Sequence, residues 1–212
     1  MQVSDLITLM GTLSVGSDNV TTAERAIFLQ YLNLAHFQLY QETANWNDDL
    51  LVAEILSTSA ESPVITLSQI PFVMIGVFDT TNKQTLSQKS IQDLIVEDPS
   101  FSAIGKPKSF YLIKNQLNFY PVPSNIIEVK VWHTPQPTSL KDDSEETDIP
   151  YPVAFHPVLV DGALYYLFQQ EGGFKNTVKE GEARERWNNG KSFLLSYFYS
   201  RRPNSLSTFS NV

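Results

Sequence analysis

The sequence contains no cysteine among its 212 residues, which excludes disulfides, thiolate nucleophiles and cysteine-ligated metals. It also lacks an apolar run of about 18 residues, the length that a membrane-spanning helix requires, so we expect no membrane partner. The first residues, Met1 to Asp5, lack the basic start and apolar core of a signal peptide. Together these absences fit a protein that is assembled in a reducing cytoplasm.

The patterns typical of catalysis and of ligand binding are missing as well. His36, His133 and His156 do not have the spacing of a His-x-x-x-His metal motif, and we interpret His133 and His156 as packing or capping residues. The acidic run Asp142–Asp148 lacks the Asp-x-Asp-x-Asp-Gly order of a calcium loop, and Gly172-Gly173 lacks the order of a phosphate loop. The Gly-x-Ser-x-Gly nucleophile motif is absent too. The sequence therefore predicts no catalytic residues, no cofactor and no bound metal.

Charged residues make up only 18% of the chain, below the usual quarter, whereas aromatic residues reach 12%. Low charge and high aromatic content are common where subunit contacts bury much of the surface, although an ordinary monomer can have the same composition. The net charge of -8 argues against tight nucleic-acid binding, since such domains are normally basic. An acidic wall around DNA that only passes through is compatible with this charge.

The charge is distributed unevenly along the chain. Gly172–Arg202 holds seven of the fifteen basic residues and three acids, a net charge of about +4, and the rest of the chain carries about -12. Complementary regions on one subunit suit head-to-tail packing around a ring. The alternative, a basic helix that is simply solvated, stays open at this point.

Helical periodicity occurs near both ends of the chain. The expected helices are 4–10, 21–42, 158–171 and 174–198, with a weak point in the last one at Asn188-Asn189-Gly190 and a loop over 11–19. Thr21 and Glu24 have the spacing of a capping box. The expected strands of the centre are 52–55, 63–67, 72–78, 83–86, 109–113, 117–120 and 126–132. In the last of these, Ile127, Val129 and Val131 share one face.

This order predicts an α+β fold in which the N- and C-terminal helices form a helical bundle and the strands form a central lobe. We expect one domain over residues 1–203, with 52–98 as a possible strand-rich insert. Residues 204–212 are expected to form an extended C-terminal arm, because they are polar and Pro203 separates them from the preceding helix.

One stretch, Gly105 to Trp187, has a distinctive order of features. A strand pair ends in Phe119-Tyr120-Pro121-Val122-Pro123, and a strand rich in β-branched residues, Ile126–Pro135, follows. The acidic loop then leads through Ile149-Pro150-Tyr151-Pro152 into a helix with small residues at its centre, Gly162 and Ala163. In this order the chain resembles the head-to-tail adaptor (connector, or ring) proteins of tailed bacteriophages, of the podovirus type.

The resemblance implies a structural virion protein. Such proteins form rings, usually dodecamers, that join the portal to the tail and let DNA pass through the lumen. The implied partners are further copies of the chain, the portal protein, and a downstream tail protein or second ring protein. The implied location is the neck of the virion at the portal vertex, after assembly in the host cytoplasm.

Candidate contact residues follow from the charge distribution and from the resemblance. A ring needs two different faces of the subunit, so we expect the acidic loop to meet the basic helix of the next copy. The residues expected at this subunit interface are Asp142, Asp143, Glu145, Arg184 and Arg186. The resemblance also implies that the C-terminal arm contacts the portal through Arg201, Arg202, Leu206 and Phe209. A disordered C-terminal end is the alternative.

Two other functions belong to different classes. A β-rich ligand- or carbohydrate-binding module of a phage tail would use Trp46, Trp132 and Trp187 as stacking platforms and would be a stable monomer. A tail-associated hydrolase would need a convergent set of carboxylates, which the sequence does not identify.

Overall fold

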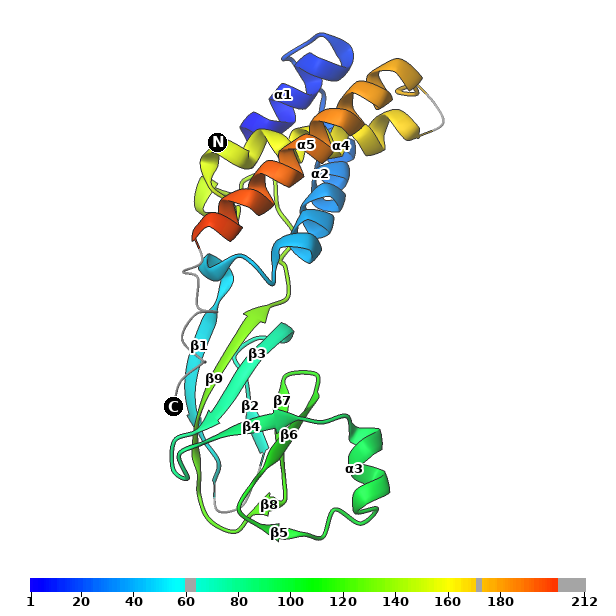
Figure 1. Ribbon diagram of the computed structural model, residues 1–212. Helices are drawn as coiled ribbons and strands as arrows, with labels where there is room; N and C mark the ends of the chain where they lie inside the picture. The colour runs from blue at the N-terminus through cyan, green and yellow to red at the C-terminus, as the bar shows by residue number, and fades with distance from the viewer. Residues whose placement is uncertain (60–63, 171–172, 202–212) are drawn as a thin grey trace. The chain divides into compact units, whose positions relative to one another are not determined.

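The structure is a computed structural model that describes residues 1–59, 64–170 and 173–201. The expected α+β class is confirmed (Figure 1). The α-helices are α1 Val3–Val15, α2 Thr22–Thr43, α3 Ile91–Glu97, α4 His156–Gln169 and α5 Thr177–Arg201, and the 3₁₀ turns are η1 Asp48–Leu50, η2 Glu146–Asp148 and η3 Val153–Phe155. The strands are β1 Val52–Ser57, β2 Val64–Thr66, β3 Pro71–Asp79, β4 Gln84–Gln88, β5 Ile104–Gly105, β6 Ser109–Ile113, β7 Gln116–Tyr120, β8 Val122–Pro123 and β9 Glu128–Pro135.

The chain divides into two compact units. The helical unit comprises Met1–Asp49 and Pro137–Val212, and the strand unit comprises Leu50–Gln136. The strand unit thus occupies one continuous segment between α2 and α4, and the expected insert 52–98 lies within it. Whether the chain acts as one adaptor domain with an insert stays a prediction.

The two N-terminal helices show one correct and one wrong prediction. The capping box of α2 is confirmed, because the Glu24 N–H donates to the Thr21 hydroxyl at 3.3 Å and the Thr21 N–H donates to the Glu24 carboxylate at 2.9 Å. The predicted loop over 11–19 is wrong for its first part, because α1 continues through Gly11 to Val15, and correct for residues 16–19, which lie outside any helix. A Cβ at Gly11 would lie 2.8 Å from the Ser17 carbonyl oxygen, so glycine there lets the returning chain pack against the helix.

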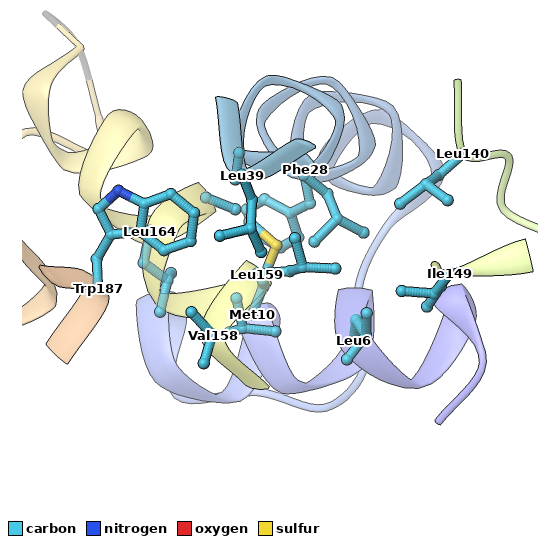
Figure 2. Close-up of a cluster of buried hydrophobic side chains, with 14 of the residues drawn as sticks. Leu6, Met10, Phe28, Leu39, Leu140, Ile149, Val158, Leu159, Leu164 and Trp187 are labelled. Carbon is cyan, nitrogen blue, oxygen red and sulfur yellow. The ribbon is translucent and has the colours of Figure 1, made fainter. Parts of the chain in front are cut away.

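The predicted weak point in the last helix is also wrong, because α5 is continuous through Gly190. A Cβ at Gly190 would lie 2.7 Å from the Val158 side chain, and one at Gly162 would lie 2.8 Å from the Trp187 ring. Each helix thus contributes a glycine at the point where the other contributes a large side chain (Figure 2 shows Val158 and Trp187). We attribute the glycine in α5 to this close helix–helix approach, whose packing compensates for its low helix propensity.

The core of the helical unit is formed by apolar side chains of α1, α2, α4 and α5 together with the connection after β9 (Figure 2). Leu140 and Ile149 come from this connection, at either end of the acidic run. The fully buried members with the largest side chains include Trp187, Phe28, Leu6, Ile7, Met10, Leu32, Leu39 and Leu159. The acidic loop is therefore attached to the core at both of its ends.

The strand unit contains a sheet of seven strands in the order β1-β9-β3-β4-β6-β7-β2. All neighbouring pairs are antiparallel except β4 with β6. Ile127, Val129 and Val131 are buried, as the alternation of that segment predicts. They belong to a core cluster that also contains Ile65, Leu67, Val77, Leu86, Phe110, Leu117 and Phe119. The chain enters this unit through β1 and leaves it through β9, which are paired neighbours.

Candidate functional site

The acidic loop between β9 and α4 is held against α2 by side chains of that helix. The Asn33 amide donates to the Leu140 carbonyl at 2.9 Å and accepts from the Leu140 N–H at 2.7 Å, as a paired strand would do. The Arg25 guanidinium binds the Asp142 carboxylate, with Nε 3.0 Å from Oδ2. The Val3 N–H donates to the Ser144 carbonyl at 3.2 Å. The loop is therefore ordered on the surface of the helical unit.

The acids of this loop have different partners. Asp142 is already paired with Arg25 of the same chain, and this hydrogen bond raises the pKa of Arg25. Asp143 and Glu145 are exposed and take part in no ion pair within the part of the chain that the structure describes. The Glu145 N–H donates to Asp148 Oδ2 at 2.9 Å, which fixes the start of η2. Two of the three expected interface acids thus have no cation beside them among the described residues.

The basic residues of α5 mostly hold the helical unit together. Arg186 Nε donates to Asp161 Oδ1 of α4 at 2.7 Å, and Lys191 Nζ donates to Glu42 Oε1 of α2 at 2.9 Å. Lys179 Nζ donates to two carbonyls at the end of α1, each at 3.1 Å, where the helix dipole favours a cation. Arg184 is exposed and has no ion pair among the described residues. Much of the positive charge expected to face a neighbour is therefore used within the subunit.

Burial affects the carboxylate that binds Arg186. Desolvation raises the pKa of Asp161, and the hydrogen bond from Arg186 opposes that rise. The Arg186 side chain remains 48% exposed, although its Nε is bound. Its terminal nitrogens make no hydrogen bond with the residues that the structure describes, so the guanidinium is oriented by Asp161 and still accessible.

The end of α5 is attached to the segment that follows α2. Arg201 Nη1 donates to Asp49 Oδ2 at 3.1 Å and to the Tyr197 hydroxyl at 3.2 Å. Tyr197 and, after it, Asp49 raise the pKa of Arg201. The rings of Trp46 and Tyr199 stack with centroids 4.2 Å apart. Of the expected portal contacts, only Arg201 is placed, since Arg202, Leu206 and Phe209 lie outside the described residues.

The three tryptophans have different surroundings. Trp187 is buried in the helical core at 1% exposure, and one face of Trp46 lies against Tyr199. Trp132 belongs to the strand unit, where the Lys130 ammonium lies 5.0 Å from its ring centroid. Trp187 therefore cannot serve as a stacking platform, and one face of Trp46 is already covered. The burial of Trp187 counts against a carbohydrate-binding module that stacks sugars on all three rings.

Sequence reasoning missed an apolar groove on the outer side of α2. The groove has a volume of about 420 Å³. Its lining consists of Gln30, Tyr31, Asn33, Leu34, Phe37 and Ser139. Leu34 is 46% exposed there. Ser139 also lines a polar cavity of the acidic loop, so the groove and the loop share a wall.

Sequence reasoning also missed Phe193 of α5, whose side chain is 70% exposed. The buried residues of this helix are Ala183, Trp187, Leu194 and Phe198. The sequence signal for Phe193 is its position outside that apolar stripe. Successive helical residues are rotated by about 100°, so Phe193 does not share the buried face of its neighbour Leu194. The groove on α2 and this exposed aromatic belong to the same helical unit.

The comparisons with known proteins agree with the order of features along the chain. The model of a family described as SU10 adaptor protein matches residues 1–192. The expected resemblance to phage head-to-tail adaptors is thereby confirmed at the level of the family. A search of curated proteins found no match. In the described ranges, no helix has the length and apolarity that crossing a bilayer requires.

Proposed function

Because the chain belongs to the SU10 adaptor protein family, we propose that it is one subunit of a ring that joins a phage portal to the tail. The family places it among the structural proteins of the virion and associates it with other phage structural proteins. The finer proposal is a dodecamer with DNA passing through its lumen and with a downstream tail protein or second ring protein below it. Its role is architectural and requires no catalytic residue.

The observation that carries this proposal is the acidic loop on α2. Its backbone is fixed by Asn33 and Arg25, and the carboxylates of Asp143 and Glu145 have no ion-pair partner in the described chain. Because the backbone of the loop is already held, docking the two carboxylates against a cation requires only their side chains to become ordered. This arrangement suits a recurring contact between copies.

The net charge supports passage of DNA without binding. At -8 per subunit, a ring of identical chains repels the phosphate backbone unless basic residues gather on the lumen. Several of the basic residues of α5 are instead bound to acids or carbonyls of their own subunit. A protein with this balance tolerates a moving duplex better than one with a basic channel.

We propose that Asp143 and Glu145 of one copy face Arg184 and Arg186 of the next. Asp142 contributes by keeping the loop on Arg25, in addition to any contact across the interface. Replacing both free acids by lysine tests this without breaking the Arg25 pair. The double variant should form fewer rings, and the loss should be greater at low salt, where repulsion is less screened.

The contact with the portal is proposed for the C-terminal residues Arg201, Arg202, Leu206 and Phe209. The attachment of Arg201 to Asp49 supports the proposal by fixing where this segment leaves the helical unit. Deleting residues 204–212 should leave the melting temperature nearly unchanged and reduce binding to the portal. Full portal binding by the truncated protein would exclude this role.

Electron microscopy of the purified protein, alone and with the portal protein of its phage, tests the central proposal. Rings with an open centre, and twelve copies by mass measurement, are the expected result. A protein that stays monomeric on the portal would contradict it. A matched control is the Asp143→Lys, Glu145→Lys variant, which should bind the portal as single copies while ring closure fails.

A further inference from the structure

The outward face of α5 combines an aromatic anchor with an oriented cation. Phe193 is 70% exposed, and Arg186 precedes it by seven residues. A spacing of seven places the two side chains on the same face of a helix, about 10 Å apart along its axis. Asn189 and Ser196, one turn on either side of Phe193, are exposed and polar. The face therefore presents one large apolar group and one guanidinium.

The face formed by α2 and the acidic loop offers complementary chemistry. Tyr31, Leu34 and Phe37 line the apolar groove of about 420 Å³. Asp143, whose carboxylate has no ion-pair partner in the described chain, lines the adjoining cavity of the loop. An apolar groove thus lies beside a free carboxylate.

We propose that the next copy of the chain occupies this groove, with its Phe193 side chain among Tyr31, Leu34 and Phe37. Its Arg186 keeps Nε on Asp161 and places its terminal nitrogens against Asp143 of the first copy. The match of apolar anchor to groove and of cation to carboxylate selects a second copy as the occupant. This contact rests on the proposed ring and identifies the two faces through which it closes.

The geometry of such a contact is heterologous, since the two faces lie on different helices of one unit. Each copy uses α5 toward one neighbour and α2 toward the other, so both faces are used once per subunit in a closed ring. The aromatic side chain supplies most of the buried apolar area, and the ion pair orients it. Sequence analysis placed Arg186 and Asp143 at this interface on charge alone, and Phe193 adds the apolar anchor.

Engineered cysteines test the contact directly, because the chain has none of its own. Under mild oxidation, a chain carrying both Phe193→Cys and Leu34→Cys should give a ladder of covalent oligomers on a non-reducing gel. A mixture of the two single variants should stop at covalent dimers, which is the signature of a heterologous contact. Val178→Cys with Leu34→Cys is the matched control, since Val178 is an equally exposed apolar residue of α5.

A charge swap tests the second half of the contact. Arg186→Glu combined with Asp161→Asn, which avoids two facing carboxylates within one subunit, should weaken self-association by about tenfold or more, as should Asp143→Arg alone. All three substitutions together should restore a large part of it. Phe193→Ser should weaken it by a similar factor, while Val178→Ser should change it by no more than about twofold. Sedimentation velocity measures each variant.

The outcomes separate this contact from the proposed ring. Cross-linking no greater than in the Val178→Cys control would overturn the contact, even if rings are seen by electron microscopy. A full ladder without closed rings would support the contact and contradict the ring. If the single cysteines are protected from a thiol-reactive reagent only when portal protein is added, the portal occupies the groove. That result would also overturn the contact.

Discussion

The helical unit and the strand unit are held together by different means. In the helical unit, ion pairs join elements that are far apart in the chain, such as Arg25 with Asp142 and Lys191 with Glu42. In the strand unit, one buried pair, His133 with Glu54, joins β9 to β1 at 2.7 Å. The helical unit also has the larger apolar core of the two. Their stabilities should therefore respond to different substitutions.

Two buried histidines, one in each unit, have different surroundings. His36 of α2 is 1% exposed and has aromatic neighbours, Phe37, Tyr40 and Tyr151. Burial lowers its pKa to about 4, although a hydrogen bond to the Thr138 backbone opposes the shift. His133 instead contacts a carboxylate directly. The buried imidazole of His36 should make the stability of the helical unit sensitive to acid. The stability of the strand unit should instead depend on Glu54, the partner of His133.

The largest expected effect is that of Trp187→Ala in the helical unit. Removing this fully buried side chain leaves a cavity between α4 and α5 and should lower the free energy of unfolding by about 3–5 kcal/mol. Trp132→Ala in the strand unit is the matched control and should cost less, about 1.5–3 kcal/mol, because part of the Trp132 ring stays in contact with solvent. Urea unfolding followed by circular dichroism measures both, and equal losses would contradict the comparison.

Acid should destabilise the helical unit through His36. The ordinary pKa near 6.5 applies to the unfolded chain and the lowered value of about 4 to the folded one, so only the unfolded state binds the proton between them. The free energy of unfolding should therefore fall by about 1.4 kcal/mol per pH unit from pH 6.5 down to pH 4 and should not depend on His36 above pH 6.5. In His36→Leu this part of the slope should vanish, as hydrogen exchange of α2 across pH would show.

The strand unit should be weakened by Glu54→Gln at neutral pH. Burial alone would raise the pKa of Glu54, but hydrogen bonds from His133 and Ser68 together lower it, so the carboxylate is the form that the fold stabilises. The substitution should cost about 1–3 kcal/mol because it weakens hydrogen bonds to a buried partner. Hydrogen exchange should accelerate in β1 and β9 while α4 stays protected.

Glu128→Gln on β9 is the control for that experiment, since Glu128 is exposed and, among the described residues, its carboxylate accepts from Thr80 alone. It should change the stability by about 0.5 kcal/mol or less. A loss as large as that of Glu54→Gln would show that the buried pair is not what stabilises the strand unit.

The smallest expected effect is that of Thr21→Ala at the start of α2. Losing the cap should lower the stability of the helical unit by about 1 kcal/mol. Thr22→Ala, one residue later, removes no capping hydrogen bond and should be close to neutral. Thermal unfolding of the two variants side by side distinguishes them. Identical melting temperatures would show that the Thr21 cap does not stabilise the helical unit.

Local signals in the sequence were sufficient wherever the relevant neighbours lie a few residues away. The capping box of Thr21 and Glu24 requires residues three apart, and the buried face of β9 requires only alternation. They were insufficient at Gly11 and Gly190, where composition indicated a loop and a weak helix. At each glycine another segment approaches the helix too closely for a Cβ atom. At Gly11 this is the chain that turns back after α1, and at Gly190 it is Val158 of α4, which is distant in the sequence.

The candidate site divides in the same way. Sequence alone determined that the chain has an acidic loop, a basic last helix and the order of elements of a phage adaptor. Only the tertiary structure decided which charges are free, because Arg25 and Asp142 are 117 positions apart and Arg186 meets Asp161 across two packed helices. The physical reason is range: helix caps and strand alternation depend on adjacent residues, whereas an ion pair depends on where whole elements pack. The same packing left Phe193 exposed and formed the groove on α2.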